Sequence, residues 1–588
     1  MWGRAVAILT AAVALASWAV AVQVLAAPSE QAPATPAPPR SAFPTPEQLD
    51  QLRQSPGPEN LFNLDVRLVD EWRLGGPFPA QVGAMPWSGK DAWNGLLAEV
   101  AQSRAGLVVS TEAMHCVARE LGRFFLAQSG RPSESLQRFM MSRCHATVAD
   151  VGFAYVDGPT GPASEAQLFE HWKQAVRDTI EHGVQGGPRT AGVWFGEQGG
   201  HAVAMVAFGR REVRVEPFSP FAADGKVEIS GEMLTPAVKV SALVNRGRFG
   251  VERCDLSEDS VPPRFHFVCE VDPKDRSAAI SMTLTPPERL LSRAGISVLA
   301  WPGTETVDVY RAPSYAKPLP VKDSASVPGE FVRLLNGVRK QAGLLPVELD
   351  EKQSQVASEL APHFFAAMFQ QAPDVNADLV VLGMIAGWGV DGIVESGHFS
   401  AAWTINDTDL GLLLSNALEY PVSRGALMAP DIGRVAVGSI LEVGEAGKAL
   451  GAVFGTYSLF SNSSHGKIAE RVYEKLERDR GGSGQGPAER LDSLSALCQH
   501  AAGSVEAGGD PADAMNVLLR ESVDVLRAPV SGWVAEVSNL DAIEFPAEYL
   551  TSPTLRVAVA VSHKRREGEP WGHYVVMLVV SDPEAWGA

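Results

Sequence analysis

The stretch FVRLLNGVRKQAGLLPVELDEKQSQVASELAPHFFAAM, residues 331–368, decides the fold assignment. Its second half has a helical stripe in which Val356, Leu360 and His363 fall on one apolar side, so the imidazole is expected to point inward. Upstream, CVARELGRFFLAQ at 116–128 has the same pattern, with Phe124 at the position of His363. The two segments therefore predict equivalent buried helices, one holding a hydrocarbon side chain and the other an imidazole.

Three hairpin patterns extend this likeness along the chain. Pairs of apolar runs joined by a Gly-containing turn occur at 190–209, 434–455 and 555–580, each after a helical segment. A hairpin alone is at best marginally stable in water, so each must pack on the helices of its own segment. The sequence predicts three diverged copies of one α/β unit that superpose on one another, with Phe124 and His363 in equivalent places.

The middle copy resembles a known family. LLNGVRKQAGLLPVELD at 334–350 precedes the helix that carries His363, ALEYPVSRGALMAPDIGRVAVGSIL follows at 417–441, and GAVFGTYSLF ends the pattern at 451–460. In order and spacing these segments resemble the bacterial CAP domain, the secreted superfamily of cysteine-rich secretory, antigen and pathogenesis-related proteins. The resemblance covers about residues 331–460 and implies an α-β-α sandwich, with fainter related units on either side.

The resemblance also implies a cavity with two histidines and two acidic residues, a group able to hold a divalent metal. By position His363 matches the first histidine, but Ser423 stands at the second, and Glu419 lies near the usual acidic position. The family's tryptophan is replaced by Ala417, and its GEN motif is at best GVDGI at 389–393. Zinc takes about three or four protein ligands. We therefore expect no metal and no cofactor.

A remnant pocket is then expected at His363, Glu419, Ser423 and Arg424. Arg424 could bind an anionic ligand there, or it could form an ion pair with Asp431 or Glu419. The ion pair is the favoured interpretation.

Residues 210–310 have a different character. Short runs rich in β-branched and aromatic residues alternate with Gly, Pro and Asp, as in REVRVEPF, KVEISGEM and RFHFVCEV. Strands at this spacing predict an all-β immunoglobulin-like sandwich, with Cys254 and Cys269 joining neighbouring strands.

The N-terminus, MWGRAVAILTAAVALASWAVAVQVLAAPSE, has the layout of a signal peptide, with Arg4 before an apolar core and cleavage expected after Ala26. The alternative is an uncleaved inner-membrane anchor at 5–26, which would be the chain's one membrane contact. Both place the protein in the periplasm or outside the cell. In that compartment we expect disulfides Cys116–Cys144 and Cys254–Cys269, with Cys498 reduced and buried.

Proline-rich and glycine-rich stretches divide the chain. The expected organisation is a signal peptide at 1–26, a Pro-rich linker at 27–47, a degenerate CAP-like unit at 48–209 and the sandwich at 210–310. A linker at 311–328, the CAP-like domain at 329–462, a helix with a Gly-rich linker at 463–487 and a last degenerate unit at 488–588 complete it.

One constellation points to an enzyme. Cys116 precedes a helix, His201 begins an apolar strand and Glu216 ends the next strand, which is the chain order of papain-like cysteine peptidases. However, Cys144 is a ready disulfide partner for Cys116.

The favoured interpretation is an exported, non-catalytic binding or scaffolding protein of the bacterial envelope or exterior. Its partner would be a protein, a lipid or an envelope polymer. The net charge of −19 over 588 residues, without a long basic run, argues against nucleic-acid binding.

Overall fold

The computed structural model describes residues 22–23, 46–55, 61–62, 64–83, 85–104, 107–161, 163–185, 188–222, 224–237, 239–257, 260–286, 292–369, 380–381, 384, 394–444, 447–460, 464–537, 540, 543–565 and 572–581. They divide mainly into two compact bodies, one with Phe43–Gly387 and His398–Thr456 and the other with Tyr457–Ala588. Most of the expected signal peptide, most of the Pro-rich linker and the segment GVDGI lie outside the described residues. Among those described, no helix has the length and apolarity to cross a bilayer.

The first α/β domain has a four-stranded sheet in the order β4-β7-β8-β6, and β4 runs parallel to β7. Its elements are α2 (Ala92–Ser103), β4 (Val108–Ser110), α3 (Glu112–Gln128), α4 (Glu134–Arg143), β6 (Gly152–Pro159), α5 (Glu165–Gly183), β7 (Arg189–Gln198) and β8 (His201–Arg210). One face of the sheet shares a core with α3 and α4, and the other shares a core with α2 and α5.

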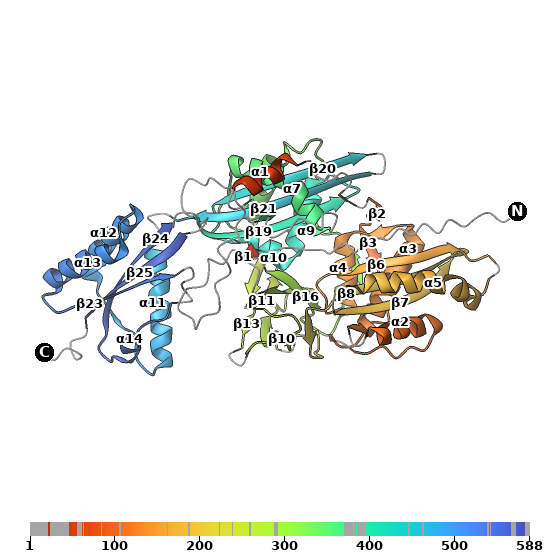
Figure 1. Ribbon diagram of the computed structural model, residues 1–588, viewed down its shortest axis with the longest axis horizontal. Helices are drawn as coiled ribbons and strands as arrows, with labels where there is room; N and C mark the ends of the chain where they lie inside the picture. Colours follow the sequence, from red (N-terminus) through yellow and green to blue (C-terminus); the bar gives the residue numbers. More distant parts are fainter. Residues whose placement is uncertain are drawn as a thin grey trace. The chain divides into compact units, whose positions relative to one another are not determined.

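The middle α/β domain repeats this order as β18-β20-β21-β19, with β18 parallel to β20 and β1 (Val22–Gln23) outside β19. Its elements are α6 (Val327–Gln341), β18 (Glu348–Leu349), α7 (Glu351–Met368), β19 (Val394–Ile405), α9 (Leu410–Glu419), α10 (Pro421–Met428), β20 (Arg434–Gly444) and β21 (Gly447–Leu459). Helices α6, α9 and α10 share one apolar core with β20 and β21. Figure 1 shows α7 beside this sheet.

The C-terminal α/β domain has the order β22-β24-β25-β23, again with the short first strand parallel to the first strand of the closing hairpin. It contains α11 (Ser464–Gly482), β22 (Glu489–Arg490), a 3-10 turn at Asp492–Leu494, α12 (Ser495–Glu506), α13 (Pro511–Leu526), β23 (Ser531–Val537), α14 (Ala547–Thr551), β24 (Arg556–Arg565) and β25 (Gly572–Ser581). All three sheets thus have one strand order, with corresponding strands in the same chain sequence.

The segment after β8 is rich in strands, as expected, and forms two sheets around one core. One sheet has the order β13-β14-β10-β9 and the other β12-β11-β15-β16. The strands are β9 (Val213–Val215), β10 (Lys226–Met233), β11 (Lys239–Arg246), β12 (Gly250–Arg253), β13 (Asp255–Leu256), β14 (Arg264–Glu270), β15 (Ala278–Thr285) and β16 (Arg293–Ala300). The expected Cys254–Cys269 disulfide is confirmed, and it links Cys254, the residue just before β13, to Cys269 on the paired strand β14.

Local sequence explains where the second helices begin. Thr111 caps α3 by accepting the N–H of Met114, and Asp350 caps α7 by accepting the N–H of Gln353. Each helix then crosses the first strand of its hairpin at a glycine. A Cβ atom on Gly192 would lie 2.2 Å from the carbonyl carbon of Met114, and one on Gly438 would lie 2.3 Å from that of Ala357. Only glycine allows this close approach.

Two segments expected as linkers are packed against folded parts of the chain. Helix α11 continues to Gly482, and Arg480 is 1% exposed and donates to the carbonyl of Gly486, so residues 478–482 are helical and 483–487 form a packed turn. Residues 311–328 are packed too. Val321 is buried in the middle core, and Tyr315 and Leu319 lie against it, because their apolar surface is more stable there than in water.

The boundary at residue 48 also differs from expectation, because the start of the chain packs on the middle domain. Helix α1 (Pro46–Gln54) contacts α7, and Arg53 forms an ion pair with Glu359. Phe62 is buried with its ring 5.5 Å from that of Phe365, and the N–H of Leu61 donates to Glu442. The chain enters the first domain only afterwards, where β2 (Val66–Arg67) pairs with β5 (Arg131–Pro132).

Candidate functional site

Arg424, the cation of the expected pocket, is 3% exposed and is bonded entirely to protein oxygens. Its Nε donates to the carbonyl of Leu418 at 2.5 Å, and Nη2 donates to the hydroxyl of Tyr315 at 2.6 Å. Its Nη1 reaches into the sandwich and lies 3.2 Å from the carbonyl oxygen of Gly247 and 3.3 Å from that of Gly250. The favoured ion pair with Asp431 or Glu419 is therefore wrong, since carbonyls and a phenol take up the guanidinium.

Glu419 is connected to Arg424 through the same phenol. Burial, followed by the charge and hydrogen bond of Glu419, raises the pKa of Tyr315. The backbone carbonyl of Glu419 also accepts a hydrogen bond from Nδ2 of Asn245, on strand β11, at 2.9 Å. Both residues of the expected pocket thus act as a joint between α9–α10 and the sandwich.

Ser423, at the place of the second histidine, is 1% exposed and bonds the hydroxyl of Ser400 at 2.5 Å. Two neutral hydroxyls satisfy one another there and supply no strong metal ligand. Among the described residues, no three His, Cys, Asp or Glu side chains gather as a metal-ion site.

His363 lies on α7, as predicted, and is 6% exposed. Its Nε2 is 3.4 Å from the hydroxyl of Ser55, which follows α1. The N-terminal segment therefore covers the imidazole, and the part of the chain that the structure describes shows no hydrogen bond from His363 to Glu419, Ser423 or Arg424. His363 thus bonds the N-terminal segment, Ser423 bonds Ser400, and Glu419 and Arg424 bond the sandwich.

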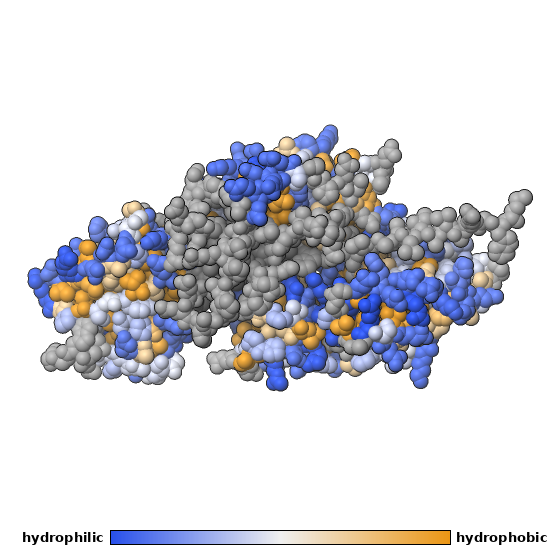
Figure 2. All heavy atoms as spheres, in the orientation of Figure 1, coloured by the Kyte–Doolittle hydropathy of each residue, from blue (hydrophilic) through white to orange (hydrophobic). Residues whose placement is uncertain are grey.

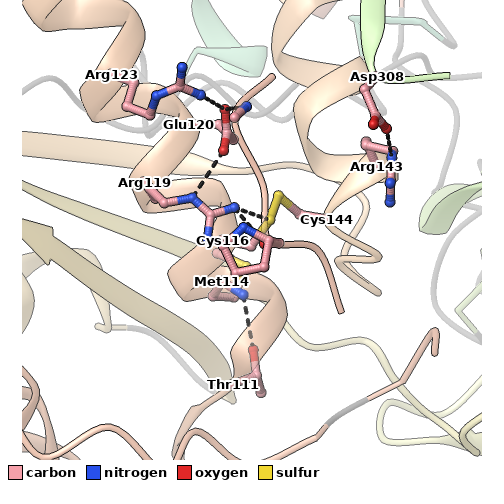
Figure 3. Close-up of a disulfide and its surroundings, with 11 residues drawn as sticks. Thr111, Met114, Cys116, Arg119, Glu120, Arg123, Arg143, Cys144 and Asp308 are labelled. Atoms are coloured by element: carbon pink, nitrogen blue, oxygen red, sulfur yellow. Dashed lines mark hydrogen bonds and ion pairs between the residues drawn. A yellow bond between two sulfur atoms is a disulfide. The ribbon is translucent and has the colours of Figure 1, made fainter. Parts of the chain in front are cut away.

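The cysteine-peptidase constellation is not assembled either. Figure 3 shows Cys116 bonded to Cys144, as the spacing predicted, so its sulfur is not a thiolate. His201 instead bonds Asp157, with Nε2 2.9 Å from the carboxylate, and the side chain of Glu216 is exposed. A thiol nucleophile and an oriented base are both required for this chemistry, so the geometry does not support the hydrolase interpretation.

Beside the disulfide lies a buried carboxylate that sequence reasoning missed. Glu120 is 0% exposed and accepts from Arg119 at 3.0 Å, from Arg123 at 2.8 Å and from the N–H of Gly75 at 3.0 Å. Arg119 also donates toward the Cys116 sulfur at 3.4 Å (Figure 3). These partners satisfy the carboxylate, so the cluster is a structural anchor for the segment at Gly75.

A second missed feature recurs in all three α/β domains. In each domain the short first strand makes its last hydrogen bond to the first strand of the hairpin early. The bonds run from the N–H of Thr111 to the carbonyl of Ala191, from that of Asp350 to Val435, and from that of Leu491 to Val557. Two residues further along the hairpin strand, a side chain binds backbone that the short strand leaves unpaired. His115 Nδ1 lies 2.8 Å from the carbonyl of Val193, Ser354 accepts the N–H of Val437 at 3.0 Å, and Tyr473 accepts that of Val559 at 3.1 Å.

Three different side chains thus bind the backbone N–H or carbonyl group that is left unpaired where the first strand ends and the helix begins. His115 also bonds the hydroxyl of Ser110 at 2.8 Å, an arrangement that resembles a nucleophile beside a base. Desolvation lowers the pKa of His115 to about 4. Because Ser354 and Tyr473 serve the corresponding backbone position, the role assigned to His115 is backbone capping.

The C-terminal domain is expected to lose stability as the pH falls from 6.5 to about 4. His563 stacks on Phe460 with ring centroids 5.0 Å apart, and burial lowers its pKa from 6.5 to about 4. The unfolded chain therefore binds the proton first, so this stability is complete above pH 6.5 and is lost through the window below it. The loss should approach about 3 kcal/mol at pH 4.

Urea denaturation across this pH range measures the effect. His563→Phe should flatten the pH dependence of the domain, whereas His500→Gln, at an exposed histidine of the same domain, should leave it unchanged. An equal slope in the His563→Phe protein would contradict the prediction.

Comparison with known proteins does not assign the chain to a family. No family model matches the chain, and no curated protein matches it in sequence. Among solved structures, a cysteine-rich secretory protein from Staphylococcus aureus aligns with 42% of this chain and 85% of its own, at 11% identity and a TM-score of 0.18. A TM-score this low does not establish a common fold.

Proposed function

We propose that this chain is an exported, non-catalytic protein that binds or scaffolds partners outside the cytoplasm. It is built from three diverged copies of one CAP-like α/β unit and an immunoglobulin-like sandwich. The shared strand order of the three sheets and the capping of the corresponding valine in each support common origin. The sandwich order β9-β10-β14-β13 with β12-β11-β15-β16 follows the A-B-E-D and C-F-G pattern, with one added strand.

The observation that supports a non-catalytic binding role is that a residue of the expected pocket, Arg424, is used for contacts within the chain. Arg424 joins the middle domain to carbonyls of the sandwich, so this position serves assembly of the chain. Two disulfides suit an oxidising compartment, where thiol chemistry at Cys116 is closed off. Partners of a protein, lipid or envelope-polymer class would then meet outer surfaces of the domains.

Thiol accessibility tests the non-catalytic assignment. At pH 8, without reductant, the native protein should take up no iodoacetamide. Cys116 is in a disulfide, and desolvation raises the pKa of Cys498 from 9 to about 12, which leaves about a thousandfold less thiolate. In urea one label per chain should appear, and Cys498→Ser should remove it.

Peptide mapping of the labelled protein identifies the cysteine. Alkylation of native Cys116, accompanied by hydrolysis of a thioester substrate, would overturn the assignment. The binding role is tested by photo-crosslinking the full chain in the producing organism. Absence of any crosslinked partner from all three α/β domains and the sandwich would overturn that part.

A further inference from the structure

In the first two α/β domains an earlier segment of the chain packs against the second helix beside Phe124 or His363. In the first, β3 (Glu71–Arg73) lies over α3, and the ring of Trp72 meets Phe124 edge-on at 4.9 Å. In the middle domain α1 lies over α7, with Ser55 beside His363. An N-terminal segment of the chain therefore covers the same place twice.

The C-terminal domain has an open groove on the corresponding helix. Ser504 follows Leu491 by thirteen residues, as Phe124 and His363 follow Thr111 and Asp350, but the 3-10 turn at Asp492–Leu494 delays the start of α12, so the count identifies the corresponding helix and not the same helix position. Ser504 is exposed and lines a groove of about 260 Å³ between α12 and α13. We call it the α12–α13 groove. It is lined by Leu497, His500, Ala501, Ser504, Gly509, Asp510, Asp513, Ala514, Val517, Leu518 and Glu521.

The floor of the α12–α13 groove is apolar. Ala501, Ala514 and Leu518 are buried and line the groove, and the two alanines are too small to fill the space between the helices. On its wall the side chain of Val517 is 41% exposed and adds apolar surface to the groove. Figure 2 shows hydrophobic surface among hydrophilic residues over α12 and α13.

The rim is acidic. Asp510, Asp513 and Glu521 stand along α13, His500 stands on α12, and neither Lys nor Arg is among the described residues that line the groove. Asp510 and Glu521 are eleven positions apart on one helix, a span of about 16 Å at 1.5 Å per residue. A segment of about three helical turns matches that length, and positive charges on it would match the rim.

We propose that the α12–α13 groove binds an amphipathic helix of a partner protein. Apolar side chains at i, i+4 and i+7 would occupy the floor, and Lys or Arg side chains would meet Asp513 and Glu521. This inference rests on the proposed binding role and names the partner class for one surface. Helix α1, an amphipathic segment whose Arg53 meets Glu359, is the occupant of the corresponding face in the middle domain.

The probe is a synthetic fifteen-residue helical peptide with leucines on one side and lysines flanking them, labelled with fluorescein. Fluorescence anisotropy with the full exported chain should show saturable binding that weakens as salt is added. A peptide with glutamates in place of the lysines should not bind. Ser504→Trp, which fills the groove from an exposed position, should weaken binding about tenfold or more.

Charge reversal on the groove rim provides a more discriminating test. Asp513→Lys combined with Glu521→Lys should lower affinity for the lysine peptide about tenfold or more and should create affinity for the glutamate peptide. Asp524→Lys, on the same helix but outside the lining, is the matched control and should retain at least most of the affinity. Each variant must keep Cys498 unlabelled by iodoacetamide, which verifies that the domain is folded.

No binding of the lysine peptide, equal binding by all variants or preference for the glutamate peptide would overturn the inference. Self-association of the chain that Ser504→Trp abolishes would also overturn it, because the occupant would then be a second copy. If the peptide fails to bind while crosslinked partners still form elsewhere on the chain, only the groove assignment falls and the binding role stands.

Discussion

Phe124→Ala should lower the free energy of unfolding of the first α/β domain by about 3–5 kcal/mol. The ring is 0% exposed and lies among Leu121, Leu136 and Met140, with Trp72 edge-on at 4.9 Å. Truncation removes buried hydrocarbon and leaves a cavity that the disulfide-linked helices α3 and α4 cannot easily close. The predicted burial at this position is confirmed, although Trp72, which covers the ring, was not foreseen.

Urea denaturation of the full chain, followed by tryptophan fluorescence, measures this loss. Phe124→Leu should give a smaller effect because it keeps most of the volume. Leu107→Ala, at a side chain 46% exposed in the same domain, is the control and should change stability by less than about 0.5 kcal/mol. A Phe124→Ala effect no larger than that of the control would contradict the packing described here.

Arg339→Met should cost the middle domain about 3–4 kcal/mol. The guanidinium is 0% exposed, and it donates to the carbonyls of Leu345 at 2.8 Å, Leu427 at 2.8 Å and Ala429 at 3.0 Å. Methionine fills part of the volume but takes the donor away from all three carbonyls, of which the one at Leu427 is fully buried. That desolvation penalty, more than the lost charge, makes the change severe.

Arg480→Met provides an independent repeat of the experiment. Near the end of α11, Arg480 donates to the carbonyls of Gly486 at 3.0 Å and Ser552 at 2.9 Å, and also to that of Tyr549. Like Arg339, it therefore bonds three backbone carbonyls. Its loss should destabilise the C-terminal domain and leave the middle domain unchanged. Arg333→Met, at a side chain 61% exposed, is the control. Stability within about 0.5 kcal/mol of the parent for both buried arginines would contradict this account.

These two arginines also show what sequence reasoning overlooked. Each is followed four residues later by a glycine with positive φ, +73° at Gly343 and +75° at Gly484, and seven residues later by Pro346 or Pro487. The common spacing was a signal for the repeat. Interpreting 478–487 as a flexible linker hid it, because a glycine-rich composition is typical of both a linker and a tight turn that needs left-handed backbone.

The sequence by itself determined the features that depend on neighbours along the chain. The closing hairpins and the pairing of cysteines 28 and 15 residues apart follow from local periodicity and short loops, whereas the expectation that Cys116 precedes its helix was wrong, because α3 already begins at Glu112. The equivalence of Phe124 and His363 could be predicted for the same reason, since one apolar stripe defines the inward side of each helix.

Only the tertiary structure decided which surfaces meet. The partners of Arg424 at Gly247 and Gly250 lie 177 and 174 residues away, and Arg53 reaches Glu359 across 306 residues. An arginine can donate to many carboxylates and carbonyls, so its own sequence neighbourhood cannot select among them. That selection depends on the packing of whole domains, which brings a carbonyl pair of the sandwich turn nearer to Arg424 than either acid that the sequence offered.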